Sequence, residues 1–527
     1  MIEFERLINH LLNQFLVYTQ NAPLLFNSGI FLVLFLIFYG GYIILYKNDL
    51  LRIVYLITFS FLFYYKSSGV FVFLLAFSAI FNYLSGFFID SFQLKRNRKI
   101  ALWFSILINV GLLFYFKYTF FFLNNWNLIT SQNIQIESIF LPIGISFFTF
   151  QAISYVVDVY RKTIPVCRNL CDFTFYLSFF PQLVAGPIVR AKDFLPQIRQ
   201  KLEFDSVTLG WGLFWILKGL FKKAVLADYI AQYVDLIYSN EAGYTGFEHL
   251  LAMYGYTIQI YCDFSGYSDM AIGLAMLMGY ELCINFDRPY LATSITEFWR
   301  RWHISLSTWL RDYIYIPLGG NRRGILRMYL ALMATMLIGG FWHGADWKFV
   351  FWGAMHGMGL VVHKIYLTLI LEFRKNNLEK NNNFNKTELN ENKKINFLKK
   401  TILSTSDNLL NSIRNSLGWL ITFHFVAFLW VFFRAESFEK AWFSIHKIIT
   451  ATEFSYARPF WETRPLFIVM LFVGLFLHFS SKLSYTNLGN YFATLPFWAK
   501  AICYLIVIQI ILQTKSEGVQ PFIYFQF

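Results

Sequence analysis

The chain of 527 residues has few charged side chains. Asp, Glu, Lys and Arg make up 14% of it, whereas ordinary soluble domains carry roughly 25%. Disordered chains, coiled coils and arrays of soluble domains all need more charge than this, so we exclude them. Cysteine is also scarce. The five cysteines are odd in number and most lie in apolar surroundings, which argues against a disulfide framework.

Several catalytic signatures are absent from the sequence as well. It contains no HExxH, Walker A, GxSxG or dinucleotide-binding pattern. Cys167 and Cys171 are four residues apart, but no second pair of cysteines completes a metal site. We therefore expect neither a bound metal ion nor a bound cofactor.

Apolar residues dominate what is present. Hydrophobic residues make up 57% of the chain and aromatic residues 21%, with a mean hydropathy of +0.47. This composition predicts an all-α, polytopic membrane protein. The net charge of +14 allows nucleic-acid binding, but the basic residues form short clusters between apolar runs, as cytoplasmic loops do. We therefore predict a membrane lipid bilayer as partner and no nucleic acid.

The apolar runs predict about 11 transmembrane helices, within a range of about two either way, since each needs about 20 apolar residues to cross a bilayer. A run at 173–188 contains Pro181, Gly186 and Pro187 and returns to basic residues, which favours a re-entrant segment buried in protein. The expected spans are 28–46, 52–65, 67–89, 100–121, 138–160, 207–234, 249–285 (as one piece or two), 327–345, 348–371, 415–433, 464–481 and 496–514.

The loops give an orientation. Three basic clusters fall on the same side of the predicted spans, which should be the cytoplasmic side, and the N-terminus is then extracytoplasmic. The clusters are Lys47 with Arg52, the group Lys95, Arg96, Arg98 and Lys99, and the group Arg161, Lys162 and Arg168.

Four regions follow from this pattern. Residues 1–25 have apolar residues at helical spacing among charges, which predicts an N-terminal interfacial helix. Residues 26–373 form a membrane core, and 374–410, rich in Asn and Lys, are predicted to be a polar cytoplasmic loop. Residues 411–527 supply the C-terminal transmembrane helices.

Two acidic residues stand in the apolar stretch YCDFSGYSDMAIG. Ionisable groups inside a membrane are costly and therefore candidates for function. Asp263 and Asp269 could bind a cation, cap the ends of a helix broken at Gly266, or pair with Arg300 or Arg301. Pairing is favoured, because buried charges usually have partners.

The segment 288–324 resembles neither a span nor a soluble helix, because tryptophans alternate with basic residues. It fits the wall of a wet cavity in the membrane or a helix at the level of the lipid headgroups, and composition does not separate the two. Ser294 or Thr293 could cap a helix there with Glu297 as the reciprocal partner. The alternating residues are Trp299, Arg300, Arg301, Trp302, His303, Trp309 and Arg311.

His343 ends a run of apolar and small residues between Gly340 and Gly344, which would leave a ligand room to approach the ring. A buried histidine is nevertheless more often a hydrogen-bonded core residue than a catalyst. His356 and His363 follow, but the three positions lack a compact spacing for metal ligands.

Six stretches, ordered along most of the chain, resemble the membrane-bound O-acyltransferase family, and within it the bacterial branch that contains the membrane component of alginate O-acetylation. They are LPIGISFFTFQAISYVVDVYR (141–161), FFPQLVAGPIVR (179–190), IQIYCDFSGYSDMAIGLAMLMGY (258–280), EFWRRWHISLSTWLRDYIYIPLGGNR (297–322), GGFWHGADWKFVFWGAMHG (339–357) and FLWVFFRAESFEKA (428–441).

The resemblance implies a helical bundle in which short helices line a funnel and a narrow tunnel. It implies that His343, in FWHG, is the family's catalytic histidine and that His303, in WHISLS, is a second catalytic position. Further candidates for substrate binding are Trp299, Arg300, Trp302, Ser305, Arg311, Trp342, Asp263 and Asp269.

On this basis the expected activity is the transfer of an acetyl group, with acetyl-CoA or another acyl thioester as donor substrate. The expected acceptor is an exopolysaccharide or peptidoglycan hydroxyl, or a periplasmic partner that passes the acetyl group on, and the expected location is the bacterial inner membrane. Arg311, Arg322 and Arg323 could meet donor phosphates, but the positive charge typical of cytoplasmic loops is the favoured explanation for them. Three alternatives stay open: D-alanyl transfer to teichoic acid, transport of a lipid-linked sugar, and a structural role in the envelope.

Overall fold

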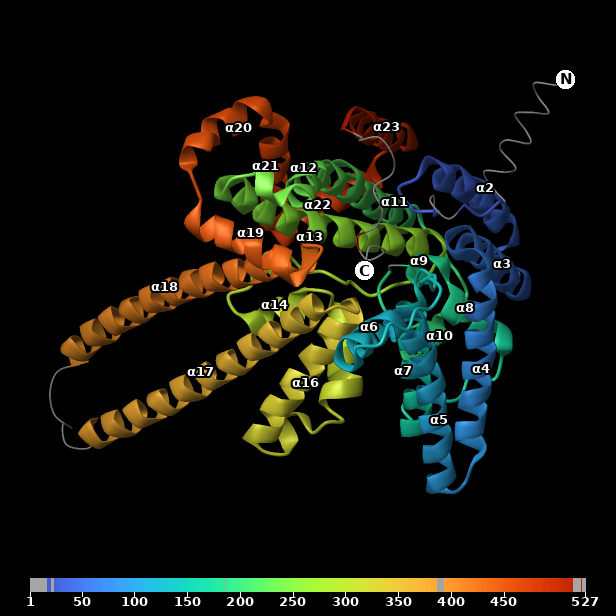
Figure 1. The fold of residues 1–527 in the computed structure, drawn as a ribbon, viewed down its shortest axis with the longest axis horizontal. Helices are drawn as coiled ribbons and strands as arrows, with labels where there is room; N and C mark the ends of the chain where they lie inside the picture. The colour runs from blue at the N-terminus through green and yellow to red at the C-terminus, as the bar shows by residue number, and fades with distance from the viewer. Residues whose placement is uncertain (1–16, 20–22, 185, 386–392, 515–522, 524–527) are drawn as a thin grey trace. The chain divides into compact units, whose positions relative to one another are not determined.

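The computed structural model describes residues 17–19, 23–184, 186–385, 393–514 and 523, and for residues 373–410 the backbone alone. All regular elements in these ranges are helices, which confirms the predicted all-α class (Figure 1). The interfacial helix predicted for residues 1–25 lies almost wholly outside the described residues. The chain divides into two units. Unit 1 comprises Met1–Asn285, Trp342–Asp346 and Glu453–Phe527, and unit 2 comprises Phe286–Phe341 and Trp347–Thr452.

Unit 1 holds the N-terminal and C-terminal helices. Its α-helices are α2 (Gly29–Leu45), α3 (Asp49–Ser68), α4 (Val72–Ser91), α5 (Lys95–Leu113), α6 (Thr119–Thr130), α7 (Ile145–Arg161), α8 (Leu170–Ser178), α9 (Phe180–Leu183), α10 (Ala191–Ile198), α11 (Ser206–Leu220), α12 (Asp228–Ser239), α13 (Gly246–Leu277), α20 (Ala457–Thr463), α21 (Pro465–Phe479), α22 (Lys482–Thr494) and α23 (Phe497–Thr514). Short π-helical turns, η2 (Phe114–Tyr118) and η3 (Phe221–Ala227), follow α5 and α11.

Unit 2 holds the segment in which tryptophans alternate with basic residues. Its helices are α14 (Ile295–Arg301), α15 (Ile304–Leu310), α16 (Ile325–His343), α17 (Trp347–Asn385), α18 (Lys393–Arg434) and α19 (Phe438–Thr450). Trp342 and His343, the last two residues of α16, belong to unit 1.

Six helical segments among the described residues are long and apolar enough to cross a membrane, or seven if a bent pair counts as one span. They are Asp49–Ser91, Lys95–Thr130, Ile325–His343, Trp347–Glu372, Asn411–Arg434 and Phe497–Thr514, and the pair is Phe454–Thr463 with Pro465–Phe479. The sequence predicted about 11. Part of the difference arises because Asp49–Ser91 covers two predicted spans, and because the single helix α13 contains three acidic residues, which lower its mean hydropathy.

The predicted re-entrant segment is two short helices, α8 and α9, packed inside unit 1. Pro181 stands in the first turn of α9, where its missing N–H costs no hydrogen bond. The Phe180 ring is fully buried and lies 5.0 Å from the Phe59 ring and 5.6 Å from the Phe63 ring, centroid to centroid. This burial agrees with the expectation that irregular backbone at membrane depth is enclosed by protein.

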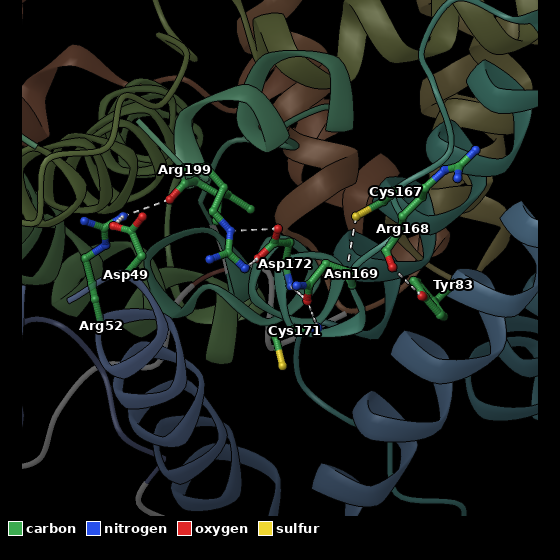
Figure 2. A network of polar contacts seen from close by, with 10 residues as sticks. Asp49, Arg52, Tyr83, Cys167, Arg168, Asn169, Cys171, Asp172 and Arg199 are labelled. Carbon is green, nitrogen blue, oxygen red and sulfur yellow. Dashed lines mark hydrogen bonds and ion pairs between the residues drawn. The ribbon is translucent and has the colours of Figure 1, made fainter. Parts of the chain in front are cut away.

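Arg52 and Arg168, from two of the three predicted cytoplasmic clusters, belong to the polar network drawn in Figure 2. Arg52, 2% exposed, donates to Tyr46 O at 3.0 Å and to Ile198 O at 2.9 Å, which ties the start of α3 to the end of α10. The neighbouring Arg199 forms a two-pronged bond to Asp172 in α8, at 2.7 and 3.1 Å. These bonds join the loop before α3 to the segments around α8 and α10, and the side of the membrane on which they lie stays a prediction.

The polar segment predicted as a loop, 374–410, is helical over much of its length. The backbone of α17 continues to Asn385, and that of α18 begins at Lys393 (Figure 1). Lys, Glu and Leu favour helices, so a polar extension of an apolar helix keeps its helical backbone. Composition alone did not reveal this continuation.

Candidate active site

His343 is the last residue of α16 and is 2% exposed. Gly340, three residues earlier, does not leave room for a ligand as the sequence suggested. A Cβ there would stand 2.4 Å from Phe349 O and 2.9 Å from Gly353 Cα, so the glycine lets α16 and α17 pack closely. Gly340 therefore serves the packing of α16 against α17 in unit 2.

Trp342 fixes the end of α16 within unit 1. Its ring stacks on Phe150 of α7 at 5.2 Å between centroids and meets the edge of Phe147 at 5.9 Å. Lys117 of η2 donates from Nζ to Trp342 O at 2.7 Å and to His343 O at 3.0 Å. The last carbonyls of a helix lack intrahelical partners and carry partial negative charge, so an ammonium here caps α16. The sequence analysis did not single out Lys117.

His303 lies between α14 and α15 with φ of +42°, a left-handed conformation that few residues other than glycine adopt. Its ring is fully buried and stacks against Phe286 at 6.3 Å. Burial lowers the pKa of His303 to about 3, so the imidazole is neutral at pH 7. Backbone strain of this kind costs about 1–3 kcal/mol and is typical of functional positions.

The predicted cap at the start of α14 is confirmed. Ser294 accepts a hydrogen bond from Glu297 N at 3.3 Å, and the Glu297 carboxylate accepts from Thr293 N at 2.8 Å. Burial raises the pKa of Glu297, but the bonds from Thr293 and Arg301 outweigh it and hold the pKa below its usual value. The carboxylate therefore stays charged and anchors Arg301, the last residue of α14, shortly before α15 begins at Ile304.

The other candidates in this segment differ in exposure. Trp302 is fully buried against Phe298 and Trp430, so it forms part of the core of unit 2. Arg311, with a side chain 57% exposed, is paired with its neighbour Asp312 at 2.7 Å. The remaining three are Arg300, which is exposed, and Trp299 and Ser305, which are 9% and 4% exposed.

Asp263 and Asp269 have buried partners, but not the predicted arginines. Asp269 is 2.8 Å from Lys222 Nζ and 3.3 Å from Lys218 Nζ. Asp263 pairs with Lys223, which also binds Asp228 at 2.7 Å. The prediction of pairing is therefore confirmed and the predicted partners were wrong, because Arg301 is bound to Glu297.

The partners of these aspartates are set by the packing of α11 and η3 on α13. A Cβ on Gly219 would stand 2.5 Å from Gly266 O, and one on Gly273 would stand 2.5 Å from Gly212 O. Gly266 therefore permits close contact within an unbroken helix, and the predicted helix break there was wrong. The sequence did carry a signal for this contact. Gly212 and Gly219 are seven residues apart in one helix, and Gly266 and Gly273 have the same spacing in the other.

His356 is a buried polar group that the motifs did not explain. Its ring lies 4.4 Å from Trp352 and 5.1 Å from Trp299, centroid to centroid, and it is fully buried. Within the described part of the chain, neither ring nitrogen has a hydrogen-bond partner. His363, by contrast, bonds to Thr296 at 2.8 Å. No group of three or more His, Cys, Asp or Glu in the described ranges could hold a metal ion.

In the described residues all regular elements are helices, several of them are apolar, and one ends at a buried histidine, which is the architecture of a helical membrane protein. Residues 73–386 match the model of the membrane-bound O-acyltransferase family, and the chain belongs to this family. It is 39% identical to a probable alginate O-acetylase, AlgI, of Pseudomonas aeruginosa, over 80% of this chain and 74% of that protein.

Two other relatives differ in the polymer they are named for. The chain is 37% identical to a peptidoglycan O-acetyltransferase of Helicobacter pylori, over 79% of this chain and 78% of that protein. It is 30% identical to a teichoic acid D-alanyltransferase of Streptococcus thermophilus, over 44% of this chain and 59% of that protein. The named O-acetyltransferases thus match much more of the chain than the D-alanyltransferase does.

His303→Ala is expected to lower acyl transfer about 100-fold while the protein still accumulates. We expect this loss because His303 is buried in a strained backbone conformation, and such conformations are typical of functional positions. Activity per mole of purified protein checks this, with His424→Ala on the exposed side of α18 as control. Near-normal turnover would reduce His303 to a structural residue.

Proposed function

We propose that this protein transfers an acetyl group from a thioester in the cytoplasm to a hydroxyl on an extracytoplasmic cell-surface polysaccharide or peptidoglycan. The observation that carries the proposal is the position of His343 at the end of α16, inside the matched family region. Support also comes from the relatives, which are named for O-acetylation of two different envelope polymers.

In the proposed reaction His343 is the general base. The acceptor hydroxyl oxygen attacks the thioester carbonyl carbon as an imidazole nitrogen of His343 takes the hydroxyl proton. The C–S bond then breaks, and the leaving thiolate recovers the proton from the imidazolium. The products are one ester and one free thiol, and His343 returns to its neutral form. Neutral imidazole suits this role because its unperturbed pKa is about 6.5.

The second histidine has a separate proposed role. His303 would orient the acceptor or donate to the oxyanion that forms on the carbonyl oxygen. A neutral ring has one N–H donor and one acceptor nitrogen, so it is able to do either. The two roles are proposed separately, because His303 belongs to unit 2 and His343 to unit 1.

The proposed location is the bacterial inner membrane with an extracytoplasmic N-terminus. The three basic loops would then face the cytoplasm, where acetyl-CoA is available. The polar network in Figure 2 holds Arg52 and Arg168 from two of these loops, which supports placing those two on one side. The acceptor would meet the protein from the opposite side. A periplasmic protein that relays the acetyl group is a proposed partner.

Purified protein in detergent or vesicles tests the donor. With acetyl-CoA and cell-envelope glycans, we expect release of one CoA thiol for each ester formed. Thiol release without ester would indicate hydrolysis, and transfer only from a D-alanyl carrier would favour the teichoic acid alternative. Movement of a lipid-linked sugar across vesicles without any ester would favour transport.

A further inference from the structure

A small pocket lies beside the end of α16 in unit 1, with a volume of about 80 Å³. One wall is the Trp342 side chain, and another is the turn that leads into α7. Most of the lining is apolar, and the charged group among the lining residues is the Lys117 ammonium. The lining includes Lys117, Leu141, Ile143, Ser146, Phe147 and Trp342.

The Lys117 ammonium is held in a fixed position. It carries three N–H donors, and the described residues supply acceptors for two of them, Trp342 O at 2.7 Å and His343 O at 3.0 Å. The third donor is thus left for a group that enters the pocket. Because the same ammonium binds the main-chain carbonyl of His343, such a group would lie near the backbone of the proposed base.

We propose that this pocket binds the acyl group of the donor, with Lys117 donating to the acyl carbonyl oxygen. The inference rests on the proposed transfer and adds to it the acyl site and its size limit. A short acyl chain suits the lining, since it offers one carbonyl oxygen to one cation and a methyl group to the apolar wall. A sugar ring has several hydroxyls, for which an apolar lining has too few partners.

The volume limits the length of the acyl chain. A water molecule occupies about 30 Å³ in the liquid, so the pocket has room for a group of a few heavy atoms. An acetyl group fits this space, and each added methylene needs further room beside the lining side chains. Ile143 is a suitable residue to shorten because its side chain is only half-buried. Its backbone N–H donates to Ser68 Oγ at 3.1 Å, and this bond does not depend on the side chain, so the backbone should keep its position.

Lys117 would also act during the transfer. The carbonyl oxygen gains negative charge as the hydroxyl attacks, and a donor already held by two carbonyls does not need to reorganise. Removing one such donor typically costs about 10²–10³-fold in kcat. Lys117 therefore has two roles in this proposal. It caps the end of α16, and it donates to the acyl carbonyl oxygen.

The first experiment compares Lys117→Met, Lys117→Arg and Lys500→Met by thiol release from acetyl-CoA. Lys500 is the matched control, since it too is a buried lysine bonded to a backbone carbonyl, Ala493 O at 2.8 Å, and it does not line the pocket. We expect Lys117→Met to lower kcat about 100-fold. Lys117→Arg should keep part of the activity, and Lys500→Met should match the unmodified protein.

The second experiment keeps Lys117 and shortens Ile143 to alanine. The rates with acetyl-CoA, propionyl-CoA and butyryl-CoA are compared before and after the change. We expect the unmodified protein to prefer acetyl-CoA, and Ile143→Ala to raise the butyryl-to-acetyl ratio about 10-fold. This ratio does not depend on how much protein folds, so it decides the matter if Lys117→Met fails to accumulate.

The outcomes distinguish a failure of the pocket assignment from a failure of the proposed acetyl transfer. If His343→Ala is inactive but the Lys117 and Ile143 variants keep the normal rate and ratio, the pocket assignment is overturned and the transfer stands. If the unmodified protein releases no thiol from any acyl-CoA, the proposed function fails. Equal rates with acetyl-CoA and butyryl-CoA in the unmodified protein would also overturn the pocket assignment.

Discussion

His343→Ala is expected to lower acetylation of the envelope polymer about 10³-fold in cells that contain normal amounts of the protein. A hydroxyl is a weak nucleophile until its proton is removed, and alanine offers no group to take it. Because the backbone carbonyl of residue 343 still accepts from Lys117, the end of α16 keeps its cap in this variant. The loss should therefore be chemical, with folding retained.

Two further variants make this prediction specific. His343→Gln keeps a polar side chain of similar size but is not a base at neutral pH, so it should be as inactive as His343→Ala. His446→Gln, at an exposed position of α19, should leave acetylation unchanged. Normal acetylation by His343→Ala at a normal protein level would eliminate the assignment of the base.

Lys223→Met is expected to prevent most of the protein from folding. Lys223 is 2% exposed and binds Asp228 and Asp263, so its removal leaves two acidic groups in the protein interior without that cation. Breaking a buried ion pair in this way costs about 3–5 kcal/mol. That is a large part of the stability of about 5–15 kcal/mol that a folded domain has. Protein yield and the temperature of aggregation in detergent measure the effect.

An exposed ion pair supplies the control, and the buried cluster itself supplies the rescue. Lys201→Met removes an exposed lysine, 87% accessible, whose pair with Glu203 should contribute little, so stability should not change. Adding Asp228→Asn and Asp263→Asn to Lys223→Met removes the uncompensated charges and should restore part of the yield. A Lys223→Met protein as stable as Lys201→Met would contradict the structural role of the cluster.

Local patterns predicted the parts of this fold that depend on near neighbours. The cap of α14 is an example, because Thr293, Ser294 and Glu297 satisfy one another within five residues. The enclosed position of the 173–188 segment is another, since its prolines and glycines cannot face lipid. The class of fold followed from composition, because a chain so poor in charge can bury its backbone in a membrane only as helices or as a closed barrel.

Contacts between distant segments were not predictable from these patterns. Asp263 is bound by Lys223, forty residues earlier, and by the backbone N–H of Ile523 at 2.9 Å, near the C-terminus. Lys117 reaches the end of α16 across more than 200 residues. The strained backbone of His303 likewise results from the packing of α14 and α15, which no single residue encodes.

The central claim is that this protein attaches acetyl groups to a polymer outside the cytoplasmic membrane. Mass spectrometry of cell-envelope glycans from cells that lack the protein tests it most directly, with the unmodified gene and the His343→Ala variant returned in parallel. We predict that one class of glycan loses mass equal to its acetyl groups, and that only the unmodified protein restores it. Glycans with unchanged acetyl content in the deleted cells would contradict the account.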